Sequence, residues 1–139
     1  MTQAKSDTQP VSMPSDAPGR KALPIFTGCI DYFPDALLAI AAVSKQGNDQ
    51  HNPGQPLHWS RGKSDDHADT AGRHLLERGT IDVDGHRHTA KAAWRVLALL
   101  QLEIEASKRD PLILGEYKNE VGDNCSVVYI NPLNHEQAK

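Results

Sequence analysis

The chain lacks three features that would each assign it to a broad class of proteins. Its 139 residues carry a formal net charge of −3, so no overall positive field attracts it to nucleic acid or to an anionic membrane. Two cysteines are too few for a disulfide framework or a zinc knuckle, which favours a reducing compartment. No apolar run approaches the roughly 20 residues of a membrane helix, and none resembles a signal peptide. We therefore expect a cytoplasmic protein that binds small molecules or protein, with no nucleic acid and no membrane partner.

The length of the chain allows one ordinary domain. Residues 1–20 contain almost no large apolar side chain, so we expect a disordered tail that cannot bury enough surface to offset the entropy of ordering. Residues 21–110 should form one helical domain, and residues 111–139 a C-terminal extension. A folded part of roughly 110 residues with amphipathic helices usually gains from oligomerisation.

The spacing of apolar residues predicts a mainly α fold, a small bundle of about three main helices. The first covers residues 34–46, with Pro34 in its first turn and Gly47 as its stop. The second covers residues 65–78, with Ser64 as its N-cap. Between them lies a loop rich in proline, glycine and polar side chains.

Residues 86–108 form the strongest predicted helix, and its apolar stripe should be the backbone of the core. The Asp110-Pro111 pair ends it, because a residue before proline is driven out of helical geometry. Two short apolar runs follow at residues 112–114 and 126–130, which favours a short C-terminal β-hairpin or an extended arm. The stripe comprises Ala90, Ala93, Trp94, Leu97, Leu100, Gln101 and Ile104.

Polar residues concentrate between Asn48 and His88, where any active site should lie. Asp66 and Asp69 are one helical turn apart, so their carboxylates can share a hard divalent ion such as Mg²⁺ or Mn²⁺. Arg73, one turn further, lies where it could meet a phosphate. The alternative is that these acids complement the helix dipole and that Asp69 forms an ordinary ion pair with Arg73. Spacing alone leaves both readings open.

The turn before the third predicted helix is rich in acids and histidines, which could bind a metal ion or act as acid and base. Such residues more often cap a helix and hydrogen-bond across a turn. The residues concerned are Asp82, Asp84, His86 and His88.

The segment around Lys63 gives a weaker indication of a phosphate-binding site. A P-loop is excluded, because Leu57 stands where its first glycine is required and no strand precedes it. What remains is a helix N-terminus with a nearby lysine, which can receive a phosphate. Trp59 could stack on a base or close the core.

Short sequence blocks are together fairly specific, although each alone is weak. They are Pro34-x-x-Leu37, Lys45-Gln46-Gly47-Asn48, His58-Trp59, Asp69-x-x-x-Arg73-His74-Leu75-Leu76, Asp82-x-Asp84-Gly85-x-x-His88 and Ala92-Ala93-Trp94-Arg95-x-Leu97-Ala98-Leu99-Leu100. Over about residues 21–105 they resemble the phage and prophage family of dATP/dGTP diphosphohydrolase N-terminal domains.

The resemblance implies a MazG-like, all-α nucleoside triphosphate pyrophosphohydrolase that assembles as a dimer or tetramer. Such an enzyme cuts a purine deoxynucleoside triphosphate to the monophosphate and pyrophosphate, and Mg²⁺ or Mn²⁺ neutralises the phosphates and acidifies a water molecule. If phage-encoded, it would act in the host cytoplasm. The candidate residues are Asp66, Asp69, Asp82 and Asp84 for the metal, Lys63 and Arg73 for phosphate, His74, His88 and Arg73 for catalysis, and Asn48 and Trp59 for the base.

One departure from the related MazG pattern keeps other functions open. That pattern has Glu-x-x-Glu on one helix and Glu-x-x-Asp on the next, whereas this chain offers Asp66-x-x-Asp69 and no matching pair on its third predicted helix. Either the second ligand set has moved to the turn with Asp82, Asp84 and His88, or catalysis has been lost. A phage protein that binds a nucleotide or inhibits a host factor without turnover is the alternative. A structural helical oligomer is the third reading.

Overall fold

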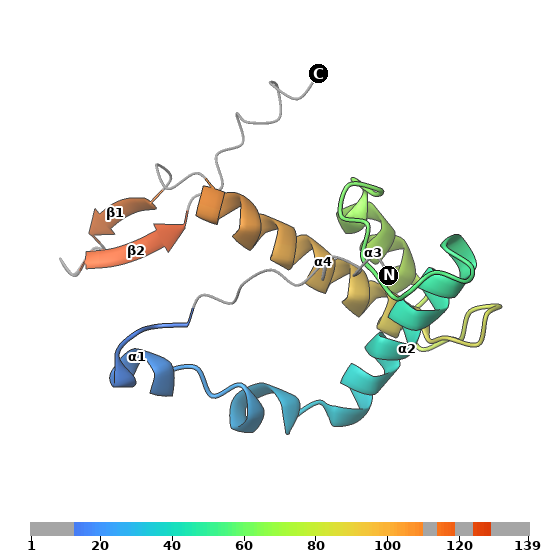
Figure 1. Ribbon diagram of the computed structural model, residues 1–139, viewed down its shortest axis with the longest axis horizontal. Helices are drawn as coiled ribbons and strands as arrows, with labels where there is room; N and C mark the ends of the chain where they lie inside the picture. The colour runs from blue at the N-terminus through green and yellow to red at the C-terminus, as the bar shows by residue number, and fades with distance from the viewer. Residues whose placement is uncertain (1–12, 110–113, 119–123, 129–139) are drawn as a thin grey trace, which may run out of the picture. The chain divides into compact units, whose positions relative to one another are not determined.

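The computed structural model describes residues 13–109, 114–118 and 124–128. The protein is mainly α, as the sequence predicted (Figure 1). It divides into two units, residues 1–95 and 96–139, and helix α4 (His88–Arg109) begins in the first and continues in the second.

The first unit begins with two short helical segments. Helix α1 (Ala17–Lys21) is capped by Asp16, whose Oδ1 accepts a hydrogen bond from the N–H of Gly19 at 2.7 Å. A π-helical turn, η1 (Phe26–Ile30), follows. Residues 1–12 of the expected disordered tail lie outside the described residues, and α1 occupies part of the remainder.

Helix α2 (Pro34–His51) begins at Pro34 as predicted, but it continues past the expected stop at Gly47. A glycine inside a helix costs about 1 kcal/mol relative to alanine. Contacts one turn apart offset part of this cost, because Lys45 pairs with Asp49 at 2.5 Å. The helix therefore carries the predicted loop residues 48–51 in regular structure.

Helix α3 (His67–Leu76) is shorter than the predicted range of 65–78. Its N-cap is Asp66 rather than Ser64, because the first helical hydrogen bond runs from the N–H of Thr70 to the carbonyl of Asp66. At the other end, the left-handed Gly79 (φ 85°) lies in the following turn rather than directly after the helix.

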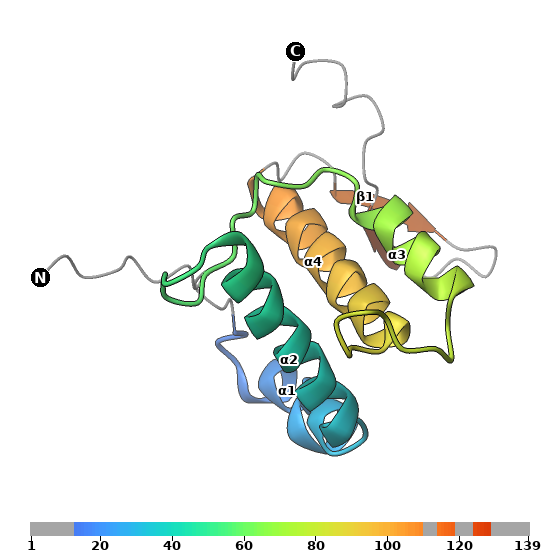
Figure 2. The same ribbon diagram turned by 90° about the vertical axis from the view of Figure 1, so that its right-hand side faces the viewer.

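A tight turn connects α3 to α4. The N–H of Asp82 donates to the carbonyl of His86 at 2.8 Å, and the N–H of His88 donates to that of Thr80 at 3.3 Å. Gly85 adopts a φ of 84°, which L side chains rarely tolerate, and so permits the reversal. Because residues 86 and 87 belong to this turn, α4 begins at His88 and not at the predicted residue 86. Figure 2 shows α2 and α3 on opposite sides of the beginning of α4.

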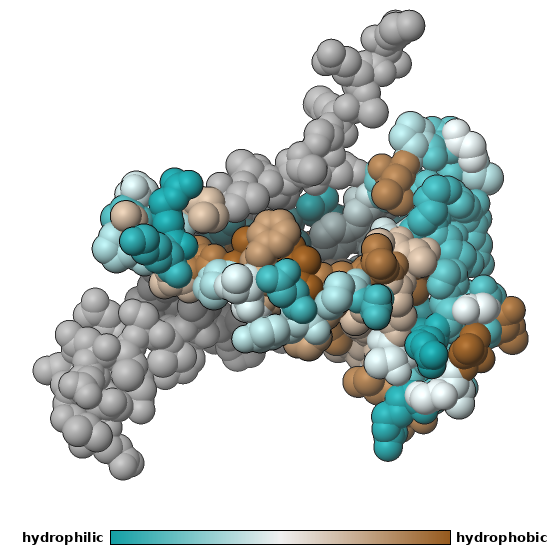
Figure 3. Space-filling model, turned by 90° about the horizontal axis from the view of Figure 1, so that it is seen from below, coloured by the Kyte–Doolittle hydropathy of each residue, from teal (hydrophilic) through white to brown (hydrophobic). Residues whose placement is uncertain are grey.

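The first unit buries few large apolar side chains. Among its described residues, the buried hydrophobic ones are Ala71, Ala90 and Ala92. Leu75 and Leu76 near the end of α3 are exposed, and the exposed fraction of Leu76 is 81 %. Figure 3 shows apolar residues at the surface beside polar ones.

No single helix in the described ranges has both the length and the apolar character of a membrane span. The segments Ala17–Ile30 and Pro34–His51, which meet at 85°, reach that length and composition only as a bent pair.

In the second unit, α4 presents an apolar stripe that the described residues leave uncovered. Leu97 and Leu100 are 48 % and 50 % exposed, and Ile104 is also exposed. The stripe is therefore not the covered core element that the sequence predicted along its whole length. A helix of this kind is stable mainly when another apolar surface covers its stripe.

Strands β1 (Leu114–Lys118) and β2 (Asn124–Val128) form an antiparallel pair, in which Leu114 lies opposite Val128 and Lys118 opposite Asn124. This is the hairpin that the sequence favoured as one of two alternatives. Residues 112–113 and 129–130 of the two predicted runs lie outside the described residues.

Candidate functional site

A cavity of about 1030 Å³ lies in the first unit. It is formed by the end of α2, the loop after it, and residues from α3, the following turn and the start of α4. Its volume matches the upper end of the range for small-molecule sites, roughly 300 to 1000 Å³. Aromatic, cationic and amide side chains line it together, including Trp59, Trp94, Arg61, Lys63, Arg95 and Asn48.

Asn48 holds the loop that forms one wall of the cavity. It is buried, its Nδ2 donates to the carbonyl of Gln55 at 3.2 Å, and its Oδ1 accepts from the N–H of His58 at 3.4 Å. The sequence predicted Asn48 as a base contact. The structure shows this amide organising the loop, with one N–H and one lone pair still available for such a contact.

Two tryptophan–arginine pairs stand in the cavity lining. The rings of Trp59 and Trp94 meet edge to face, with centroids 6.1 Å apart. The guanidinium carbon of Arg61 lies 4.4 Å from the Trp59 centroid, and that of Arg95 lies 5.7 Å from the Trp94 centroid. Trp59 was predicted at the site, whereas Trp94 was assigned to packing alone. An arginine beside each tryptophan, in Trp59-Ser-Arg61 and Trp94-Arg95, was the signal that could have identified the two cations.

His67 is a cavity-lining residue that the sequence did not single out. It is only 4 % exposed, and its Nδ1 lies 3.3 Å from Nη1 of Arg95. Because a guanidinium can only donate, Nδ1 accepts and the proton resides on Nε2, a buried atom for which the structure shows no hydrogen-bond partner. Burial, and then the charge of Arg95, lower the pKa of His67, so the ring is neutral near pH 7.

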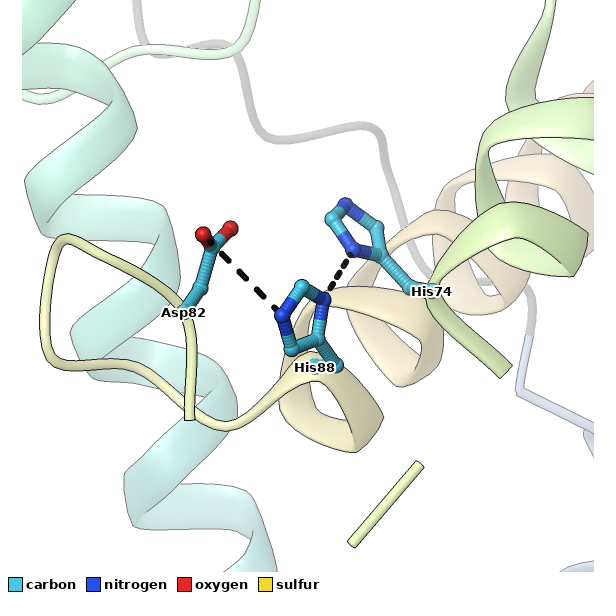
Figure 4. Close-up of side chains that lie close together, drawn as sticks. All are labelled: His74, Asp82 and His88. Atoms are coloured by element: carbon cyan, nitrogen blue, oxygen red, sulfur yellow. Dashed lines mark hydrogen bonds and ion pairs between the residues drawn. The ribbon is translucent and has the colours of Figure 1, made fainter. Parts of the chain in front are cut away.

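Two histidines and one aspartate form a separate group, which we call the cation cluster. His74 near the end of α3, Asp82 in the turn and His88 at the start of α4 each offer a ligand atom, and these atoms lie within 4.8 Å of one another (Figure 4). The two Nδ1 atoms are 2.9 Å apart, and Nε2 of His88 lies 4.0 Å from Oδ1 of Asp82. Burial, and then the charges of His88 and Lys91, lower the pKa of His74, so its ring is neutral and retains a lone pair.

Lys91 binds both aspartates of the turn. Its Nζ lies 2.6 Å from Oδ2 of Asp82 and 2.5 Å from Oδ2 of Asp84. These hydrogen bonds are the largest cause that lowers the pKa of each carboxyl group, so both acids are ionised at neutral pH. His74, Asp84 and Lys91 also line the cavity. The cation cluster and the cavity are therefore parts of one site.

Two predicted metal ligands lie elsewhere. Asp66 precedes α3 instead of lying within it, so it does not share a helical face with Asp69. Its Oδ2 accepts hydrogen bonds from the hydroxyl of Thr70 at 2.9 Å and from Arg73 at 3.1 Å, which lower its pKa in that order. Neither Asp66 nor Asp69 belongs to the cation cluster or to the cavity lining.

The residues predicted to contact phosphate or the base also fall into two groups, those that line the cavity and those that do not. Lys63 and Trp59 line the cavity, whereas Arg73, which was predicted at phosphate, does not. Arg73 instead donates to Thr70 at 2.7 Å and pairs with Asp66. The ion pair with Asp69 that the sequence offered as an alternative is thus replaced by one with Asp66.

The cluster fits a divalent cation by the type of its ligands. A lone pair of neutral imidazole and an ionised carboxylate are both common metal ligands. Two ligands at roughly 2.1 Å from one ion lie about 3 Å apart when they are adjacent. The 2.9 Å separation of the His74 and His88 nitrogens agrees with this spacing.

Comparisons with known proteins gave one positive result. A family model described as "dATP/dGTP diphosphohydrolase, N-terminal" matches residues 20–111. No curated protein and no solved structure matches the chain. The matched segment contains every residue of the cavity and of the cation cluster.

Proposed function

The chain belongs to the dATP/dGTP diphosphohydrolase N-terminal family, and we propose that it hydrolyses purine deoxynucleoside triphosphates to the monophosphate and pyrophosphate with a divalent cation. One observation carries the proposal. A single cavity presents aromatic and cationic side chains and is continuous with a cluster able to hold a cation. The proposal includes a phage origin and action in the host cytoplasm.

The triphosphate would be held by the cations of the cavity lining. Lys63 lies in the loop before α3, and Arg95 lies in α4 beside Trp94. Ammonium and guanidinium groups form strong, charge-assisted hydrogen bonds to phosphate oxygens. Arg73 is left out of this role, because it does not line the cavity.

The base would lie against Trp59. An indole ring offers a flat apolar surface to a purine, and the N–H and lone pair that remain on Asn48 offer polar contacts. The N–H on Nε2 of His67 is a further donor, available if a bound nucleotide shifts the neighbouring side chains. An unpaired buried donor is costly, so binding that pairs it would be favoured.

His74, Asp82 and His88 would hold the cation. When bound, a divalent ion supplies neutralisation of phosphate charge and a more acidic water. The sequence suggested His74 for proton transfer, and His88 for proton transfer or metal binding. We assign them to metal binding instead, because a lone pair that binds a metal ion is no longer free to accept a proton.

A second candidate function is nucleotide binding without turnover, and one observation favours it. Lys91 holds Oδ2 of both Asp82 and Asp84, so these carboxylates are partly used within the chain. The acids of α3 do not join them. A site with so few free carboxylates would bind the two or three ions of a typical phosphoryl-transfer centre poorly.

Product analysis separates these two functions. The purified chain is incubated with each deoxynucleoside and ribonucleoside triphosphate in Mn²⁺ or Mg²⁺, and products are resolved by ion-exchange chromatography. Reaction in ¹⁸O-labelled water should place the label on the monophosphate if water attacks the α-phosphorus. A His88→Gln variant purified identically controls for contaminating hydrolases. No product under any condition, with stoichiometric binding by calorimetry, would establish the binding protein instead.

We also propose that the chain forms a homo-oligomer, a dimer or a tetramer. The exposed stripe of Leu97, Leu100 and Ile104 supports this, because these side chains recur at spacings of three and four residues on one helix face. A second copy offers the same stripe and can cover it symmetrically. Sedimentation velocity measures the assembly directly.

A further inference from the structure

We infer that His74, Asp82 and His88 select a transition-metal ion such as Mn²⁺ over Mg²⁺. Lys91 contributes to this selectivity, because its ammonium group lies between Asp82 and Asp84 and takes the place of a second cation. The inference rests on the proposed function only in assigning this ion a role in hydrolysis. Binding of the ion is a property of the cluster itself.

The ligand set decides which ion is preferred. Two of the three ligands are imidazole nitrogens, which suit first-row transition-metal ions, whereas Mg²⁺ prefers oxygen ligands and retains its water. Within that series Mn²⁺ binds a nitrogen site less tightly than Co²⁺. The ring nitrogens of His74 and His88 already stand 2.9 Å apart. In this contact one ring nitrogen donates to the other, so an ion that binds both rings must displace the shared proton.

His88 is oriented from both sides of its ring. The residue is 7 % exposed, its Nδ1 lies 3.2 Å from Oε2 of Glu77, and its Nε2 lies 4.0 Å from Oδ1 of Asp82. If Nδ1 binds the ion beside Nδ1 of His74, the Nε2 atom of His88 faces the carboxylate of Asp82. Such carboxylate–histidine–metal arrangements fix the tautomer and raise the basicity of the ligand.

The charge balance also disfavours Mg²⁺. Two ionised carboxylates and one ammonium leave a net charge of about −1 for Asp82, Asp84 and Lys91. A hard ion that binds through carboxylate charge finds Oδ2 of both aspartates engaged by Lys91, and only their Oδ1 atoms lie outside these ion pairs. An ion that binds imidazole depends less on these carboxylate oxygens.

The turn itself keeps the aspartates in position. Oδ1 of Asp82 accepts the N–H of Val83 at 2.7 Å, and Oδ1 of Asp84 accepts the N–H of His86 at 3.2 Å. These are local turn contacts, which set the direction of each carboxylate without metal. A merely structural cluster would need the same contacts, so metal binding must be measured.

Calorimetry on the metal-free full chain provides that measurement. We expect one Mn²⁺ or Co²⁺ per chain, bound roughly tenfold or more tightly than Mg²⁺. The visible spectrum of the Co²⁺ form should show nitrogen coordination. His74→Gln and His88→Gln should each weaken Mn²⁺ binding by roughly tenfold or more. Mg²⁺ binding as tight as Mn²⁺ binding, or no loss in either variant, would overturn the inference.

His86→Gln is the matched control, because His86 lies in the same turn and outside the cluster. It should bind Mn²⁺ as the unmodified chain does, and an equal loss in this variant would show adventitious histidine binding. Circular dichroism checks that each variant is folded. If the buried His88 proves necessary for folding, the partly exposed His74 decides the question.

Lys91→Met separates the role of the ammonium group. Removing it frees Oδ2 of both aspartates, so affinity for Mg²⁺ should rise and selectivity for Mn²⁺ should fall. Unchanged Mg²⁺ affinity in a folded variant would overturn the role given to Lys91. All these titrations contain no nucleotide. A chain that binds Mn²⁺ without hydrolysing any triphosphate therefore contradicts only the proposed function, and one that hydrolyses with Mg²⁺ bound as tightly contradicts only this inference.

Discussion

Residues 67–95, the polar region, and the apolar stripe at residues 96–104 differ in how their side chains are partnered. In the first region, charged and polar side chains find partners a few residues away, as in the Lys91 ion pairs with Asp82 and Asp84. In the second, Leu97, Leu100 and Ile104 remain exposed. The polar contacts of the first region lie within one chain, whereas the described residues leave the apolar side chains of the second exposed. We therefore expect changes in assembly to affect the stability of the protein more than its proposed activity.

The largest expected effect comes from breaking the polar region. Under the proposed function, His74→Gln should reduce hydrolysis by on the order of 10²-fold or more, because a metal ligand is lost while the fold remains. Steady-state kinetics with saturating Mn²⁺ measures this, and His58→Gln serves as a control at an exposed cavity histidine. Activity equal to the control would remove His74 from the mechanism.

The next effect comes from charging the apolar stripe. Leu100→Glu should dissociate the oligomer, since a carboxylate buried in an apolar interface is strongly unfavourable. Sedimentation velocity should show a shift to monomer, and the free energy of unfolding should fall with it. Ala106→Glu adds the same charge at another exposed position of α4 and should leave assembly intact. An unmodified chain that is already monomeric at high concentration would refute the proposed assembly.

A smaller effect distinguishes two predicted phosphate contacts. Lys63→Ala should raise the KM for the triphosphate about tenfold, as expected for one lost charge-assisted hydrogen bond. Arg73→Ala should leave KM unchanged, because Arg73 pairs with Asp66 outside the cavity. The reverse outcome would restore Arg73 to the site and remove Lys63.

Acid should destabilise the polar region through His67. Its pKa is lowered in the folded chain from the usual 6.5, so the unfolded chain binds the proton more readily as pH falls below that value. Stability should therefore be full above about pH 6.5 and decline on acidification. Urea midpoints at pH 7.5 and 5.5 measure the decline. His67→Gln should reduce it, leaving the similar contribution of His74, and an unchanged pH dependence would contradict the assignment.

The smallest effect is expected at Asp66. Asp66→Asn removes an exposed ion pair with Arg73, and such pairs contribute little to stability. Mn²⁺ affinity and hydrolysis should remain those of the unmodified chain, which calorimetry and kinetics can show together. A strong loss of hydrolysis with unchanged Mn²⁺ affinity would mean that Asp66 acts at the site when nucleotide is bound.

Local patterns in the sequence were sufficient for several features. Pro34 marked the start of α2, and the Asp82-x-Asp84-Gly85 pattern indicated a turn, because the preferences of proline and glycine act within one or two residues. Helix ends were harder, since Gly47 and Ser64 are ordinary stop and cap signals that neighbouring contacts overrode. His74 was recognised as a candidate for proton transfer, and His88 as a candidate for proton transfer or metal binding.

By itself, the sequence determined the mainly α architecture and the family, since these depend on periodicity and on short motifs. Only the tertiary structure decided which acids and histidines meet. His74 and His88 are 14 residues apart and adjacent in space, whereas Asp66 and Asp69 are neighbours in sequence and do not share a site. The spacing of residues along a helix predicts which side chains share a face only within that helix. The connection between α3 and α4 sets which side chains of the two helices meet.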